Sequence, residues 1–151
     1  MTHGGIDRAL DLPSGSTSYY FRTRRALLDA AVRRLTEQSR LAFDDVAGSD
    51  PADAIGRYLH HLVTDRSTDV RARFALASDA AHDPELAAAL SRCLFSADGA
   101  AALFAGLGSS SPHDDAADLL VFCEGVAAAH LFGAAPEHDD LIDSVRRRFG
   151  L

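Results

Sequence analysis

LPSGSTSYYFRTRRALL, which spans residues 12–28, is the stretch that decides how this chain is organised. Its first four residues favour a tight turn, because proline presets one backbone angle and glycine relieves steric restriction. The next five residues, Ser16–Tyr20, are too few and too polar for a core helix. Thr23 is a good N-cap, so a longer helix is expected to follow it. The stretch therefore predicts a turn, a very short polar helix and the start of a longer helix.

The distribution of charge separates this end of the chain from the rest. Residues 1–40 hold seven arginines and four acidic residues, a balance of +3, whereas residues 41–151 hold eight arginines and eighteen acidic residues, a balance of −10. The net charge of −7 argues against nucleic acid if it is taken alone. A basic end on an acidic body is instead typical of a DNA-reading head on a sensor body. Small hydroxyls beside two tyrosines also suit contact with phosphates and base edges.

Residues 6–35 resemble the second half of the helix-turn-helix in TetR-family transcriptional regulators. The family pattern is a hydrophobic residue, a turn with glycine, a small polar stretch, an aromatic pair, a phenylalanine, and a basic residue before an apolar helix. One departure is Ser18, where the family usually has tyrosine. The matching residues are Leu12, Gly15, Ser16, Thr17, Tyr19, Tyr20, Phe21, Arg24, Ala26, Leu27 and Leu28.

The resemblance implies which residues would meet DNA. Hydroxyl groups of the short helix would lie at the groove, Gly15 would allow close backbone approach, and Arg24 would sit on phosphate at the start of the linking helix. Phe21 is interpreted as a core residue. The alternative is an ordinary corner between two helices with no DNA contact. The predicted DNA-binding set is Ser14, Gly15, Ser16, Thr17, Tyr19, Tyr20 and Arg24.

The residues before the turn predict an incomplete head. Residues 6–10 look like the end of a helix, with Ile6 and Leu10 on one face. Gly4 and Gly5 would each cost about 1 kcal/mol inside a helix, so residues 1–5 are not expected to be helical. The first helix of the family's three-helix head has no counterpart here, and we expect the chain to begin late. A shortened head that no longer binds DNA is therefore the main alternative to a working one.

The rest of the sequence predicts an all-α body. Alanine dominates the apolar residues, there is no tryptophan and β-branched residues are few, and this composition favours helices. Asp50 and Asp83 each precede a proline, as N-caps do. Apolar spacing predicts helices over residues 23–43, 51–65, 70–81, 84–107, 113–133 and 138–149. Breaks are expected at residues 47–49, 67–69 and 106–112 and at Pro136.

Two domains follow from this pattern. Residues 1–43 are interpreted as a partial helix-turn-helix domain with its linking helix, and residues 44–151 as a ligand-sensing and dimerisation domain of the TetR type. The family's last two long helices pair with those of a second subunit as a four-helix bundle. A monomer that buries these faces internally is the alternative. The predicted homodimer interface is Phe122, Gly125, Val126, Ala129, Gly133, Leu141 and Val145.

The resemblance also implies a small apolar effector that changes the spacing of the two heads, with repression as the family's usual mode of action. Aromatic residues of the body suggest a mainly apolar cavity, although core packing uses the same residue types. The predicted pocket residues are Tyr58, Phe74, Phe95, Phe104, Phe122 and His130.

Other site chemistry finds little support in the sequence. His60 and His61 are adjacent and point to different sides of a helix, so they cannot chelate a metal as an i, i+4 pair could. There is no phosphate-binding glycine loop or nucleophile elbow, and no enzyme, metal or cofactor is expected. Cys93 and Cys123 are interpreted as buried free thiols. No apolar run reaches the length of a membrane span, so we expect a soluble, cytoplasmic protein.

Overall fold

The computed structural model describes residues 2–46, 48–134 and 137–151. Within these ranges the chain forms nine α-helices and no β-strand, which confirms the all-α prediction. Two residues at predicted breaks, Ala47 and Pro136, lie outside the described residues. The helices are α1 His3–Ala9, α2 Ser16–Tyr20, α3 Arg24–Asp44, α4 Pro51–Val63, α5 Ser67–Ala80, α6 Pro84–Arg92, α7 Ala97–Gly106, α8 Pro112–Leu131 and α9 His138–Phe149.

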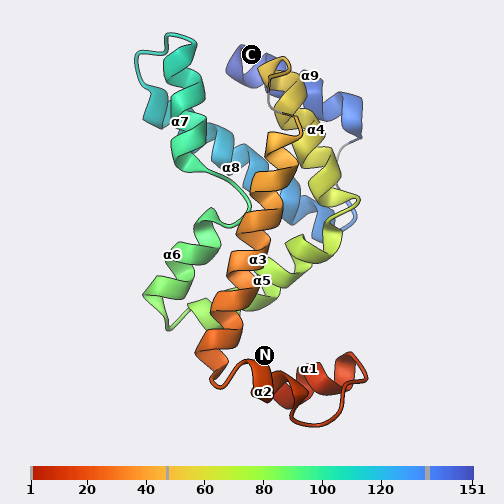
Figure 1. Ribbon diagram of the computed structural model, residues 1–151. Helices are drawn as coiled ribbons and strands as arrows, with labels where there is room; N and C mark the ends of the chain where they lie inside the picture. Colours follow the sequence, from red (N-terminus) through yellow and green to blue (C-terminus); the bar gives the residue numbers. More distant parts are fainter. Residues whose placement is uncertain (1, 47, 135–136) are drawn as a thin grey trace.

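The long helix α3 joins two unequal parts of the molecule (Figure 1). Helices α1 and α2 pack against each other at the N-terminal end of α3, away from the other helices. In the remaining part, α4 packs on α9, α7 packs on α8, and α5 packs on α6. The arrangement is a small head on a helical body, with one continuous helix between them.

Local capping explains where several of these helices begin. The side chains of Thr23, Asp50 and Asp83 each accept a hydrogen bond from the backbone N–H three residues later, at 3.1, 3.2 and 3.0 Å. These bonds satisfy N–H groups that the first helical turn leaves without a backbone partner. The three predicted N-caps are confirmed.

The predicted single helix over residues 84–107 was wrong, because the structure has two helices there. Helix α6 ends at Arg92 and α7 begins at Ala97, after Ser96. The Ser96 hydroxyl accepts a hydrogen bond from the Gly99 backbone N–H at 3.0 Å, so it caps a new helix. No single helix among the described residues is long and apolar enough to cross a membrane. Only α6 and α7 taken together have that length and composition, and a bend of 42° separates them.

The start of the chain also differs from the prediction, because Gly4 and Gly5 lie within α1. The Thr2 side chain caps this helix by accepting a hydrogen bond from the Gly5 N–H at 3.2 Å. A Cβ atom on Gly5 would lie 2.9 Å from the Thr2 hydroxyl oxygen, so glycine permits this close approach. Leu10 lies just after α1, at its C-cap position, and is 64% exposed.

Helix α5 begins at Ser67, where a turn was predicted. Its N-cap is Arg66, whose side chain is buried instead of capping the helix. The buried residues of α5 are Val70 and Leu76, whereas Phe74 is half-buried and Ala77 is exposed. Apolar spacing predicts Phe74, Ala77 and Ala81 on one stripe of this helix, and the structure does not bury that stripe.

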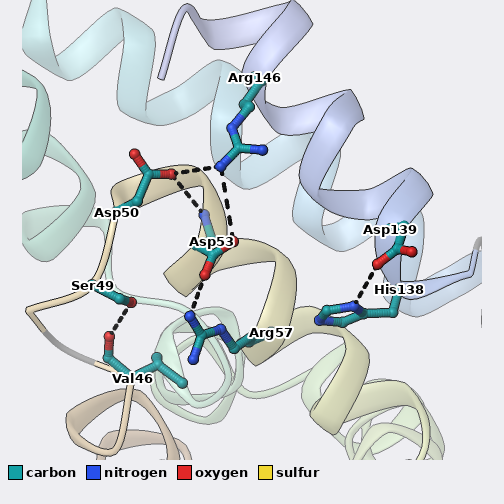
Figure 2. A network of polar contacts seen from close by, with 8 residues as sticks. All are labelled: Val46, Ser49, Asp50, Asp53, Arg57, His138, Asp139 and Arg146. Atoms are coloured by element: carbon teal, nitrogen blue, oxygen red, sulfur yellow. Dashed lines mark hydrogen bonds and ion pairs between the residues drawn. The ribbon is translucent and has the colours of Figure 1, made fainter.

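Helices α4 and α9 approach each other closely. Gly56 faces Ile142, and a Cβ atom on Gly56 would lie 2.4 Å from the Ile142 Cγ1 atom and 3.1 Å from its Cα. At the end of the same contact, Arg146 of α9 reaches Asp50 at 3.2 Å and Asp53 at 3.8 Å (Figure 2). Across the described part of the chain, the largest side chains that are essentially fully buried are Leu59, Leu62, Leu86, Leu141, Val70, Val145 and Cys93.

This close contact predicts that Gly56→Ala lowers the free energy of unfolding by about 1–3 kcal/mol, the usual cost of overpacking. Ile142 cannot yield easily, because its backbone as well as its side chain faces Gly56. Urea unfolding measures the change. Gly106→Ala is the matched control, because a Cβ there meets no heavy atom of the described residues within 4 Å. It should leave stability unchanged or raise it by up to about 1 kcal/mol. Equal effects of the two substitutions would contradict the assignment.

Candidate functional site

A buried carboxylate holds α2 against α1. Asp7, on α1, is 3% exposed and accepts hydrogen bonds from the backbone N–H groups of Gly15 and Thr17, both at 2.9 Å. The Thr17 hydroxyl donates a further hydrogen bond to Asp7 at 2.5 Å. Gly15 occupies the N-cap position of α2 but has no side chain, so Asp7 provides the cap from a neighbouring helix. The orientation of α2 therefore depends on Asp7.

These hydrogen bonds lower the pKa of Asp7 below its ordinary value of 3.8, with the Thr17 hydroxyl as the largest cause. A carboxyl whose pKa is lower in the folded state stabilises that state above the unfolded pKa. The stabilisation is lost as the pH falls through the lowered, folded value. The packing of α1 on α2 should therefore weaken only at pH values below about 3.8.

Some of the predicted DNA-binding residues of this head are exposed, and others already have hydrogen-bond partners within the protein. Tyr19 and Tyr20 are 81% and 77% exposed, with their rings in an edge-to-face contact at 5.3 Å. Ser14 and Gly15 are also exposed, and the half-buried Ser16 donates a hydrogen bond to the Pro13 carbonyl. Thr17 is 6% exposed, and both its N–H and its hydroxyl are bound to Asp7. Thr17 therefore positions the short helix rather than facing outward.

Arg24, predicted to meet phosphate, forms an ion pair with Asp79 of α5. The neighbouring Arg25 contacts Asp83 at 2.7 Å and Glu85 at 3.0 Å, at the junction of α5 and α6. Single exposed ion pairs contribute little stability, but these share one end of α3. They connect the head end of the linking helix to the body.

Some of the predicted dimer residues are buried inside the protomer, and the others are exposed or half-buried. Val126, Leu141 and Val145 are buried inside the protomer, so they are not open to a second copy. Gly125 and Gly133 are exposed, and Phe122 and Ala129 are half-buried. Two exposed apolar residues that the sequence did not single out are Val121 of α8 and Phe132 directly after it, at 72% and 85% exposure, and helical spacing relates both to Gly125 and Ala129. We call Val121, Gly125, Ala129 and Phe132 the α8 stripe.

The predicted pocket residues do not gather in one place. Tyr58 and Phe95 pack together with ring centroids 6.1 Å apart. Phe104 and Phe122 instead pack against Phe149, at 6.5 and 5.8 Å, where α7, α8 and α9 meet. A surface pocket of about 510 Å³ lies at this second position, and Phe104, Arg148 and Phe149 line part of it. The half-buried Phe74 lies below the guanidinium of Arg73, and the half-buried His130 has its Nε2 atom buried without a partner among the described residues.

A polar cluster inside the body was missed by the sequence interpretation. Arg66 is 8% exposed, and it donates to Asp69 from Nε at 2.9 Å and to Ser39 from Nη2 at 3.0 Å. Its Nη1 atom is buried and has no hydrogen-bond partner in the part of the chain that the structure describes. Tyr58 lies beside this cluster and donates to the Leu94 carbonyl. Burial raises the pKa of Tyr58, so its hydroxyl stays protonated.

The remaining titratable residues of the core are engaged with one another or buried. Arg73 forms a bidentate pair with Glu124 at 2.6 Å for both contacts, and its Nε donates to the Leu90 carbonyl. Cys93 and Cys123 are free and buried, as predicted, and burial raises the pKa of Cys123 to about 12. No group of three or more histidine, cysteine or acidic residues in the described ranges could hold a metal ion.

Comparison with protein families matches residues 48–150 to the family described as "Tetracyclin repressor-like, C-terminal domain". The match covers more than half of the chain and contains α4–α9. Helices α1–α3 lie before it. No curated protein matches the chain.

Proposed function

The chain belongs to the tetracyclin repressor-like C-terminal domain family, and on this premise we propose that it is a ligand-responsive transcriptional regulator that binds operator DNA as a dimer. Domains of this family typically bind ligands and form dimers in TetR regulators, a non-enzymatic family. In the proposal residues 1–43 read DNA, residues 44–151 bind a small effector and a second copy, and repression is the mode of action.

One observation carries the DNA-binding part of the proposal. Helix α2 presents two almost fully exposed tyrosines at the end of the molecule farthest from α9, and Asp7 fixes its orientation (Figure 1). Contiguous exposed apolar surface marks interaction sites on proteins, and the two adjacent rings contribute such surface here. Tyrosine hydroxyls can donate hydrogen bonds to phosphate oxygens while the rings contact the groove edge.

The α8 stripe supports the dimer. Its exposed valine and phenylalanine leave an apolar surface on α8 and just after it, in the region where the resemblance leads us to expect the subunit interface. The small residues between them would let a second helix approach closely. Two heads in such a dimer would then meet successive major grooves, about 34–36 Å apart.

The effector would act through α3, which carries α2 at one end and packs on body helices along its length. The pairs of Arg24 and Arg25 with the acidic residues of α5 and α6 would move the head with the body. An effector can shift operator affinity only by the difference between its affinities for the two arrangements.

An electrophoretic mobility shift with the DNA upstream of the native coding region tests the proposal. Saturable retardation supports a working head if the logarithm of the affinity also falls linearly with the logarithm of the salt concentration. We expect the Tyr19→Phe, Tyr20→Phe double variant to bind this DNA about tenfold more weakly, because two hydroxyl hydrogen bonds are lost. Scrambled DNA of the same length is the control, and the double substitution should reduce the affinity for it by a smaller factor.

A second candidate function is a dimeric ligand-binding module whose head does not bind DNA. The engagement of Thr17 by Asp7 and of Arg24 by Asp79 favours it, since two predicted contact residues already have partners. The same mobility shift separates the two functions. A dimer that retards none of the native upstream DNA at low salt supports the second.

A further inference from the structure

The cluster around Arg66 is the strongest feature of the body that packing does not explain. Residues of three different helices and two connections meet there: Ser39 on α3, Tyr58 on α4, Arg66 before α5, Asp69 within α5, and the Leu94 carbonyl after α6. Charged residues are rarely buried unless they are fully paired. A buried guanidinium that is paired on only part of its edge is therefore costly.

The guanidinium of Arg66 is only partly satisfied. Arginine has five N–H donors, and the contacts to Asp69 and Ser39 use Nε and Nη2. Nη1 is buried and has no acceptor among the described residues. A buried donor without an acceptor carries the full cost of its desolvation. The Nη1 donor of this cluster could therefore bind one more acceptor oxygen.

The charge of the cluster restricts the acceptor. Asp69 already balances Arg66 at 2.9 Å, with the arginine side chain 9% exposed. A carboxylate ligand would add a second negative charge to a buried pair and leave it uncompensated. An uncharged carbonyl oxygen would accept from Nη1 without this penalty.

Aromatic rings lead from the surface to this cluster. Phe43, near the C-terminal end of α3, is 46% exposed and packs on the buried Tyr58 with ring centroids 5.8 Å apart. Tyr58 packs in turn on the buried Phe95 at 6.1 Å. These packed rings connect the exposed end of α3 with Tyr58, which lies beside Arg66.

We propose that Arg66, Ser39 and Tyr58 form the polar end of the effector site, and that its ligand is an uncharged aromatic molecule with a carbonyl oxygen. This assignment rests on the proposed function and specifies its effector. The ring lies against Phe43, Tyr58 and Phe95, and the carbonyl accepts from Nη1 of Arg66. Ser39 and Phe43 both belong to α3, so occupation of the site changes contacts of the helix that carries the head.

Three probes that share one ring test the assignment: acetophenone, ethylbenzene and benzoate. Titrations followed by saturation-transfer NMR give a dissociation constant for each with the full chain. We expect acetophenone to bind at least about tenfold more tightly than the other two, because only it offers a neutral acceptor. Arg66→Met should reduce this preference to less than about twofold.

Arg73→Met is the matched control, because the donors of Arg73 are already bound by Glu124 and the Leu90 carbonyl. It should keep the acetophenone preference. If Arg66→Met fails to fold, Arg66→Lys serves instead, since it keeps a charge for Asp69 but lacks Nη1.

Equal binding of the three probes to the wild type, or an unchanged preference in the folded Arg66 variant, overturns the assignment. The mobility shift is scored separately. If the protein retards operator DNA but does not prefer acetophenone to the other two probes, this site is rejected and the proposed regulator stands. If the protein prefers acetophenone but does not retard the DNA, the site is supported and DNA binding is rejected.

Discussion

A Gly125→Arg variant is expected to be monomeric and to bind operator DNA at least about a hundredfold more weakly than the wild type. The loss arises because two linked heads gain avidity of about 10²–10⁴ over one, and a single head forfeits it. Gly125 lies in the centre of the α8 stripe, between exposed Val121 and Phe132. A long charged side chain there would have to be buried against a second copy, which interfaces tolerate poorly unless it is paired.

The protomer itself should tolerate this substitution. A Cβ atom on Gly125 meets no heavy atom of the described residues within 4 Å, and arginine is a better helix former than glycine. Unchanged helical content with a halved mass by light scattering is therefore the expected result. Ala88→Arg, at an exposed position of α6, adds the same charge and should leave the dimer intact. A dimeric Gly125→Arg protein with full operator affinity would show that copies associate elsewhere.

Helix starts could be predicted from the sequence because they depend on local bonds. Thr23, Asp50 and Asp83 each cap a helix through an N–H three residues away, and this spacing is visible in the sequence. Ser96 followed by Gly99 carries the same signal, and it was missed inside a continuous apolar pattern. Fold class was predictable for the same reason, since composition and caps both act within a few residues.

Which apolar face is covered could not be predicted from spacing. Periodicity shows that Leu141 and Val145 share an apolar face, but not whether α4 or a second copy covers it. In the structure α4 covers it, because Gly56 allows α9 to approach closely. On α8 and just after it, the large apolar residues that stay exposed are instead Val121 and Phe132, and no local sequence signal distinguishes them from buried ones.

Buried polar partners were missed for a related reason. Asp7 caps a helix whose N-cap residue, Gly15, lies eight residues further along the chain, and Arg66 meets Ser39 across 27 residues of sequence. Neither pairing has a local signature. The nearest available signal was Gly15, a helix start with no side chain of its own to cap it, which implies a cap from another element.

Asp7→Asn is expected to release α2 and to abolish operator retention while the body stays folded. The carboxylate accepts three hydrogen bonds at the start of α2, and an amide has only one oxygen to accept them. Its NH₂ group would also face the N–H donors that the carboxylate now binds. Hydrogen exchange of the Gly15 and Thr17 amides should therefore accelerate about tenfold, as expected for a lost cap.

The matched control is Asp11→Asn, which removes the same charge from the same head. Asp11 is exposed and has a φ of 51°, a left-handed conformation that asparagine also adopts readily. It should keep both the slow exchange and the operator retention. A pH titration adds a second readout, because the pKa of Asp7 is lowered from 3.8 and wild-type protection should therefore decline only at pH values below that ordinary value. Asp7→Asn should lack this acid transition, and a variant that exchanged as slowly as the wild type would show that the turn alone orients α2.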